Sequence, residues 1–160
     1  MKTSNQNLRA IIIEDEVASQ NLLKTIISDY CVNVEHVGTA GNMAKGIELI
    51  ENCKPDLVFL DIELGKGNAF DLLDQLRTTD FRVIITSAYA DYALKAFKYE
   101  VVDYVLKPYS PKDILKAVEK VKKIALTSDV LEELRGLVNA KTTQSETDKL
   151  YLPSNSGLTA

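Results

Sequence analysis

Five apolar runs rich in β-branched residues recur along the first 125 residues, and stretches with helical spacing of apolar residues separate them. The runs lie at 10–13, 32–37, 57–60, 83–86 and 101–106. Strands that are nearly continuous apolar runs are buried on both faces, and parallel strands need helical crossovers between them. The alternation therefore predicts an α/β fold, a doubly wound (βα)5 domain with a five-stranded parallel sheet.

Local signals agree with this alternation. Pro55 ends the second helical stretch, because proline resists continuing a helix. Ser110 and Pro111 are a good N-cap and first position for the fifth helix. The helical stretches carry Val17, Leu22, Leu23, Ile26 and Ile27; Met43, Ile47, Leu49 and Ile50; Phe70, Leu72, Leu73 and Leu76; Ala93, Leu94 and Phe97; and Ile114, Leu115, Val118, Val121 and Ile124.

Composition excludes several classes of protein. A chain with 46% hydrophobic and 26% charged residues is not wholly disordered, and its net charge of −4 lacks the positive excess of an autonomous nucleic-acid binder. Cys31 and Cys53 are too few for a disulfide scaffold, so we expect a reducing cytoplasm. No early apolar run is long enough for a signal peptide or membrane span. The single histidine, His36, excludes an internal zinc site with two histidines.

The pattern changes after Leu126. Apolar residues still recur at helical spacing to Val138, either as a continuation of the fifth helix or as a separate one. Residues 142–148 are polar and indicate a linker, and 150–152 resemble the opening of a strand. We expect a domain at 8–126, a helical connector and linker at 127–148, and the start of a second, truncated domain at 149–160.

Polar residues follow four of the predicted strands. Glu14, Asp15 and Glu16 follow the first strand and Asp61 the third, while Thr86 and Ser87 end the fourth and Lys107 follows the fifth. Because ligands of an open parallel sheet bind beyond the carboxyl ends of its strands, we expect these groups to converge.

Gathered carboxylates repel one another, so the cluster needs a cation or a proton. Hard oxygen ligands suit Mg²⁺ better than a soft metal. With positive charge from the metal and Lys107, a carboxylate can attack phosphorus, and a hydroxyl can bind a phosphoryl oxygen. Phosphoryl transfer requires this combination of positioning and charge neutralisation.

Four motifs carry a resemblance to a known family. They are Ile-Glu-Asp-Glu at 13–16, Asp-Leu-Val-Phe-Leu-Asp at 56–61, Ile-Thr-Ser-Ala at 85–88, and Asp-Tyr-Val-Leu-Lys-Pro at 103–108. In this order they resemble the receiver domain of bacterial two-component response regulators. The resemblance covers roughly residues 8–126 and implies a flavodoxin-like fold with strand order 2-1-3-4-5.

The resemblance implies a role for each matching position. Asp61 would be the phosphoacceptor, and Mg²⁺ would be held by Asp15, by Glu14 through water, by Asp61, and by the backbone carbonyl of Glu63. Ser87 would bind the phosphoryl oxygen and Lys107 would pair with it. Tyr104 would be the aromatic switch residue, whose rotamer changes with the position of Ser87. The Lys107–Pro108 peptide would be cis.

Two positions depart from the common pattern or leave it ambiguous. Glu14 occupies a position where receivers more often have aspartate. Its side chain is longer but should still reach a metal-bound water. Thr86 and Ser87 both carry hydroxyls, and the following Ala88 favours Ser87 as the phosphate ligand. Glu16 is more simply a solvated acid in the first turn of a helix.

Aromatic residues cluster late in the predicted domain. Six of 11 fall between Tyr89 and Tyr109, either as core packing or as an interaction face that rearranges. The stretch at 87–97 is similar to receivers that precede LytTR-type DNA-binding domains, and 150–158 resembles the opening of such a domain. In receivers, the fourth helix, fifth strand and fifth helix form the homodimer face. The fifth helix carries several lysines that could contact DNA, but Asp113, Glu119 and the net negative charge of the chain favour a solvated face.

The resulting hypothesis is a signalling switch. A sensor histidine kinase would phosphorylate Asp61, and the signal would pass through dimerisation to a DNA-binding domain beyond this chain and so regulate transcription. The chain would catalyse only its own phosphorylation and dephosphorylation, without acting on outside substrates. One alternative is a phosphate-independent pseudo-receiver that only dimerises. The other is a haloacid-dehalogenase-like phosphatase, disfavoured because the first strand lacks Asp-x-Asp.

Overall fold

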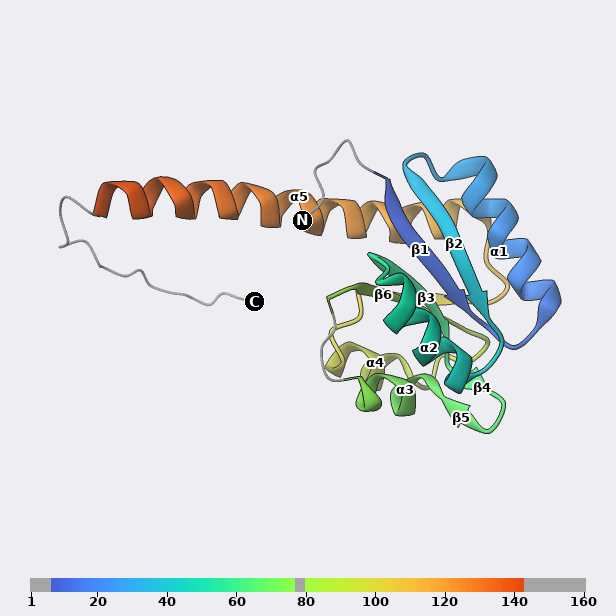
Figure 1. Ribbon diagram of the computed structural model, residues 1–160. Helices are drawn as coiled ribbons and strands as arrows, with labels where there is room; N and C mark the ends of the chain where they lie inside the picture. The colour runs from blue at the N-terminus through green and yellow to red at the C-terminus, as the bar shows by residue number, and fades with distance from the viewer. Residues whose placement is uncertain (1–6, 77–79, 143–160) are drawn as a thin grey trace. The chain divides into compact units, whose positions relative to one another are not determined.

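Strands and helices alternate through most of the chain (Figure 1). The computed structural model describes residues 7–76 and 80–142. The chain divides into two compact units, Met1–Ile124 and Ala125–Ala160. In chain order the elements are β1 (Leu8–Ile13), α1 (Val17–Tyr30), β2 (Val34–Ala40), α2 (Met43–Cys53), β3 (Leu57–Asp61), β4 (Glu63–Leu64), β5 (Gly67–Asn68), α3 (Ala69–Gln75), β6 (Arg82–Ser87), α4 (Ala93–Lys98), β7 (Asp103–Leu106) and α5 (Pro111–Thr142).

Five parallel strands form the central sheet, in the order β2-β1-β3-β6-β7. Counted along the chain, the sheet strands stand in the predicted order 2-1-3-4-5. The direction of winding reverses between β1 and β3, which pair from Ala10 with Leu57 to Ile13 with Leu60. A sheet of this kind binds ligands at that reversal, beyond the carboxyl ends of its strands.

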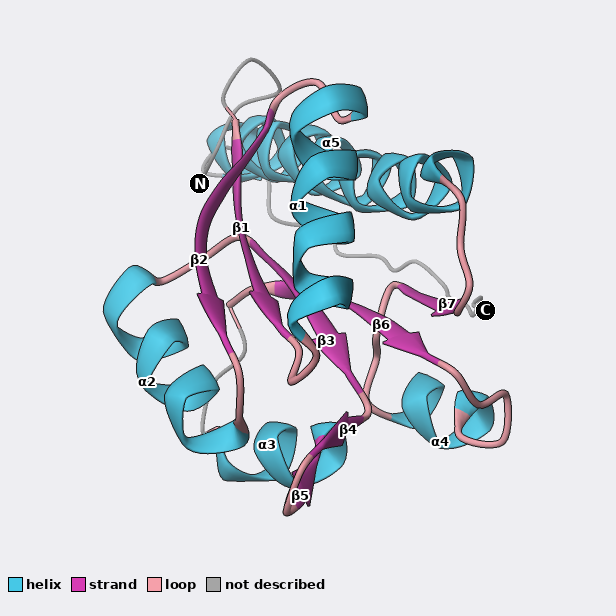
Figure 2. Cartoon of the chain, turned by 90° about the vertical axis from the view of Figure 1, so that its right-hand side faces the viewer, coloured by secondary structure: helices cyan, strands magenta, loops and turns pink. Residues whose placement is uncertain are grey.

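Helices cover both faces of the sheet (Figure 2), and side chains that alternate between the two faces build a core on each. On one face, alternate strand residues such as Ile13 and Leu60 pack with α2, α3 and α4. On the other, residues such as Ile12 and Phe59 pack with α1 and with α5 as far as Val121. Burial on both faces explains why the strands are apolar throughout, as the sequence pattern indicated.

Two strands begin later than predicted, and one hairpin was not predicted. The second strand begins at Val34, because Val32 is 71% exposed and Asn33 takes a left-handed φ of 66°. The fifth sheet strand begins at Asp103, although Val101 before it is buried. The antiparallel β4–β5 hairpin after the third sheet strand was not predicted, because a turn through Gly65 leaves only two residues in each arm.

The N-terminus of α5 has the predicted cap. The Ser110 hydroxyl accepts from the Asp113 N–H at 3.3 Å, and the Asp113 carboxylate accepts from the Ser110 N–H at 2.9 Å. The helix then continues without a break to Thr142, which answers whether the connector is a separate helix. Thr142, the first residue of the linker predicted at 142–148, is still helical. The rest of that linker and the strand predicted at 150–152 lie outside the described residues. Among the described residues, no helix is long and apolar enough to cross a membrane.

Candidate phosphoacceptor site

Two adjacent strands bring three carboxylates together. Glu14 and Asp15 follow the last residue of β1, and Asp61 is the last residue of β3. Because Ile13 is in register with Leu60, the residues after them meet at one edge of the sheet. One carboxylate oxygen of each residue lies within 4.8 Å of the other two. Glu14 and Asp61 are 3% and 7% exposed, whereas Asp15 is exposed, so two of the carboxylates are buried and the third faces solvent.

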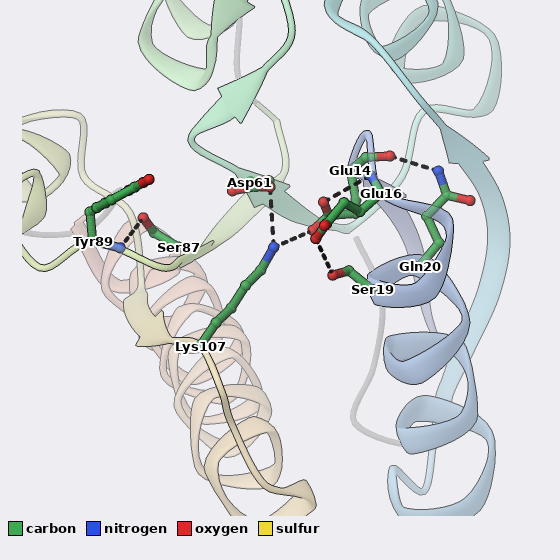
Figure 3. Close-up of polar contacts among 8 residues, drawn as sticks. All are labelled: Glu14, Glu16, Ser19, Gln20, Asp61, Ser87, Tyr89 and Lys107. Atoms are coloured by element: carbon green, nitrogen blue, oxygen red, sulfur yellow. Dashed lines mark hydrogen bonds and ion pairs between the residues drawn. The ribbon is translucent and has the colours of Figure 1, made fainter.

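Lys107 supplies positive charge to this cluster (Figure 3). It follows β7, and its Nζ donates to Glu14 Oε1 at 2.8 Å and to Asp61 Oδ2 at 3.2 Å. The peptide between Lys107 and Pro108 is cis, as predicted. The ammonium group therefore joins two carboxylates from different strands.

The proton affinities of these groups reflect burial and crowding. Burial raises the pKa of Glu14, against the hydrogen bond from Lys107. Burial and the neighbouring charge of Glu14 also raise the pKa of Asp15. Burial works to lower the pKa of Lys107, but its bonds to Glu14 and Asp61 outweigh burial and the pKa is raised. The site thus holds its lysine charged while its acids are crowded.

Residues around Glu14 hold it in place. Its Oε2 accepts from the Glu16 N–H at 3.2 Å, and its carbonyl accepts from Gln20 Nε2 at 2.7 Å. The Glu16 carboxylate accepts instead from the Ser19 hydroxyl at 3.0 Å and is not one of the three carboxylates that converge. Glu16 therefore contributes its backbone and not its side chain. The sequence held no signal for this contact, because a backbone N–H is common to all residues except proline.

Ser87 is connected to Tyr104 through the backbone of one residue. Ser87 is 1% exposed, and its Oγ accepts from the Tyr89 N–H at 3.0 Å. The Tyr89 carbonyl in turn accepts a hydrogen bond from the Tyr104 hydroxyl. The Ser87 carbonyl also accepts from the Lys107 N–H at 2.7 Å, which joins the ends of β6 and β7. Sequence reasoning named Ser87 and Tyr104 but missed the link through Tyr89.

The donor set fits a hard divalent cation. Three carboxylates converge, and Asp15 and Glu63 both line an adjacent cavity of about 450 Å³. Carboxylate and carbonyl oxygens with room for water are the ligands that Mg²⁺ prefers. The residues that would hold the ion are Glu14, Asp15, Asp61 and the backbone of Glu63.

The other candidates in the sequence take structural positions. His36 lies half-buried on the edge strand β2, and its Nε2 is 2.7 Å from Thr39 Oγ1. Cys31 is buried and Cys53 is half-buried, and both are free thiols. Thr86 is as buried as Ser87, so burial alone does not choose between the two hydroxyls.

Comparisons with known proteins agree with this geometry. Residues 10–119 match the family model of the response regulator receiver domain. The sensory transduction protein LytT of Bacillus anthracis is 32% identical over 149 residues, which cover 91% of this chain and 58% of that protein. LytT of Enterococcus faecalis is 36% identical over 119 residues, covering 72% of this chain and 48% of that protein. The chain thus spans about half the length of these relatives.

Solved structures show the same fold. The response regulatory domain of mrkE from Klebsiella pneumoniae superposes with a TM-score of 0.67 at 26% identity, covering 73% of this chain and 97% of that one. The receiver domain of AraT from Geobacillus stearothermophilus gives a TM-score of 0.69 at 25% identity, covering 76% and 98%. The matched residues 10–119 contain all the carboxylates, the hydroxyls and the lysine described above. The chain therefore belongs to the response regulator receiver domain family of two-component systems.

Proposed function

We propose that Asp61 accepts a phosphoryl group from a sensor histidine kinase and that the resulting aspartyl phosphate switches this chain between two signalling states. The observation that carries the proposal is the bridge from Lys107 to both Glu14 and Asp61. A buried carboxylate held beside an ammonium group, with two further carboxylates within 4.8 Å, has the groups that phosphoryl transfer to an acid needs.

The chemistry follows from the placement of the side chains. An Asp61 oxygen attacks the phosphorus of a phosphohistidine, the P–N bond breaks, and its electron pair returns to the imidazole, which takes up a proton. The Lys107 ammonium stabilises the charge on the phosphoryl oxygens, and the Ser87 hydroxyl donates a hydrogen bond to one of them. A bound Mg²⁺ would supply further neutralisation of charge. The chain would act on its own Asp61 and not on outside substrates.

The connection from Ser87 to Tyr104 supports a route for the signal. If Ser87 turns toward a phosphoryl oxygen, its bond with the Tyr89 N–H changes, and the Tyr89 carbonyl holds the Tyr104 hydroxyl. Apolar side chains near this end of the route are exposed, with Leu94 at 82%, Phe97 at 52% and Leu106 at 45%. This face of α4, β7 and α5 is the proposed homodimer surface, through which a DNA-binding domain outside this chain would control transcription.

Phosphorylation in vitro tests the proposal. Acetyl phosphate with Mg²⁺ should add one phosphoryl group to the wild-type chain, measured by intact-protein mass spectrometry. Asp61→Asn should abolish the adduct, and Asp29→Asn, an exposed acid on α1, should leave it unchanged. An undiminished adduct in Asp61→Asn, or none in the wild type, would contradict the proposal. If the wild type forms no adduct, the chain would instead be the phosphate-independent pseudo-receiver. Turnover of a general phosphomonoester would indicate a phosphatase.

A second pair of variants assigns the phosphate ligand. Ser87→Ala should slow phosphorylation and weaken binding of beryllofluoride, whereas Thr86→Val, of similar shape and equal burial, should not. The reverse result would move the role to Thr86.

A further inference from the structure

The cavity beside the phosphoacceptor site extends to residues that the site does not use. Its volume of about 450 Å³ lies within the range of pockets that hold small molecules. Asp15 and Glu63 of the site line it, and so do Phe70 on α3, Tyr92 just before α4 and Lys95 on α4. A small molecule that fills this cavity therefore borders both the acidic cluster and α4.

An aromatic ring holds Lys95 in place. The Nζ of Lys95 lies 4.6 Å from the centroid of the Phe70 ring, a distance at which the face of a ring attracts an ammonium group. The Phe70 side chain is 2% exposed, and its ring packs against those of Tyr92 and Tyr99 at centroid distances of 6.2 and 5.2 Å. A ring packed in this way has little freedom to move. It therefore fixes the ammonium group of a side chain that is otherwise flexible.

The charge of Lys95 is available to a bound anion. Lys95 is the one basic residue among the described residues that line the cavity, and Asp15 and Glu63 are the acidic ones. Within 7–76 and 80–142, no carboxylate forms an ion pair with Lys95, whereas Lys107 is already paired with Glu14 and Asp61. Without Lys95 the charged side chains of this lining would all be carboxylates, which repel an entering anion.

We propose that Lys95 binds the negatively charged phosphate of a small acyl phosphate as it enters the cavity, and so raises the rate at which that donor phosphorylates Asp61. This role of Lys95 rests on the proposed function, because it adds a donor-binding residue to the same site. In the transfer, an Asp61 oxygen attacks phosphorus and the P–O bond to the acyl group breaks. The electron pair of that bond leaves on the carboxylate product, so the step needs no proton and no redox partner.

The two lysines act on different stages of the reaction. The Nζ of Lys107 lies 3.2 Å from Asp61 Oδ2, so it neutralises charge where the new bond forms. Lys95 is exposed and contacts neither Asp61 nor Glu14, so it acts on the donor before transfer. A charge at the entrance of a site speeds the capture of an oppositely charged ligand, and salt weakens this effect. Lys95 should therefore change the donor concentration that gives half the maximal rate more than the maximal rate itself.

The rate of adduct formation on the whole chain tests this role. Intact-protein mass spectrometry would follow the reaction with Mg²⁺ over a range of acetyl phosphate concentrations. At low salt, Lys95→Met should lower the second-order rate constant by about threefold to tenfold, whereas Lys95→Arg, which keeps the charge, should stay within about twofold of the wild type. Lys98→Met is the matched control, because Lys98 is also exposed on α4 but does not line the cavity. Circular dichroism verifies that the variants fold.

Two further readouts separate an effect of charge from an effect on structure. High salt should reduce the difference between the wild type and Lys95→Met, because salt screens an exposed charge. Phosphoramidate, which carries less net negative charge than acetyl phosphate at neutral pH, should also show a smaller difference. A Lys95→Met variant that only displaced α4 would react more slowly with both donors, by the same factor at every salt concentration, and would overturn the proposal.

The remaining outcomes distinguish this proposal from the proposed function. Equal rates for the wild type and Lys95→Met would overturn the role of Lys95 and leave it as a surface lysine that covers the Phe70 ring. The proposed function would survive that result, because Asp61 would still be phosphorylated. An equal loss of rate in Lys98→Met would assign the effect to the overall charge of α4 and would overturn the role of the cavity. Absence of an adduct in the wild type would contradict both proposals.

Discussion

Replacing Lys107 with methionine tests the electrostatics of the site most directly. Methionine keeps the length of the side chain and removes only the charge that bridges Glu14 and Asp61. At an effective dielectric constant near 20, an ammonium 2.8 Å from one carboxylate and 3.2 Å from another attracts them by about 6 and about 5 kcal/mol. These are gross attractions, because burying the ammonium has already cost several kcal/mol of its hydration.

The net loss of stability is therefore smaller than their sum. Removing one partner of a buried ion pair typically costs about 3–5 kcal/mol, because the remaining charge is left uncompensated. We expect Lys107→Met to lower the free energy of unfolding by this amount in metal-free buffer at pH 7.5. That loss is a large fraction of the 5–15 kcal/mol typical of a whole domain.

Urea unfolding monitored by circular dichroism measures this loss. Lys45→Met is the control, because Lys45 is exposed on α2 and should change stability by less than about 0.5 kcal/mol. Adding Asp61→Asn to Lys107→Met should recover part of the loss, since one uncompensated carboxylate disappears. Adding Mg²⁺ should stabilise Lys107→Met more than the wild type, because the ammonium no longer competes for the carboxylates.

Two results would refute this reasoning. One is a Lys107→Met variant within 1 kcal/mol of the wild type in metal-free buffer. The other is an equal gain from Mg²⁺ in both proteins, which would mean that Lys107 and the cation do not share the carboxylates.

Three further predictions concern stability away from the cluster. Gly46→Ala should lower the free energy of unfolding by about 1–3 kcal/mol in a urea titration despite alanine's helix preference, because the new Cβ would lie 2.9 Å from Ile13 Cδ1 and 3.1 Å from its Cγ2; a gain in stability would contradict this packing. Burial lowers the pKa of His36, so the unfolded chain binds a proton there more readily, and the free energy of unfolding should fall as pH drops below about 6.5. His36→Gln should make the melting temperature less dependent on pH in this range. An unchanged pH dependence would exclude His36 as its cause. Ser110→Ala should lower the free energy of unfolding by about 1 kcal/mol, because it removes the hydroxyl that accepts a hydrogen bond from the Asp113 N–H. An unaltered melting temperature would show that this cap does not contribute to stability.

The sequence alone was enough for the sheet and for most of the site. Buried parallel strands must be apolar on both faces and need helical crossovers between them. Apolar runs therefore alternate with helical stretches along the sequence. Asp61 and Lys107 could be named because residues that follow parallel strands share one edge of the sheet. The cap at Ser110 was equally readable, because its hydrogen bonds run between residues three apart.

Contacts between distant backbone groups were decided only by the tertiary structure. The link from Ser87 to Tyr104 passes through the N–H and carbonyl of Tyr89, and no side chain marks such groups in a sequence. The short β4–β5 hairpin also left no periodicity to read. The length of α5 as one continuous helix, and the end of its burial in the core at Val121, also became visible only in the structure. The spacing of apolar residues can be read from the sequence, but the exposure of a side chain depends on which residues pack against it in the fold.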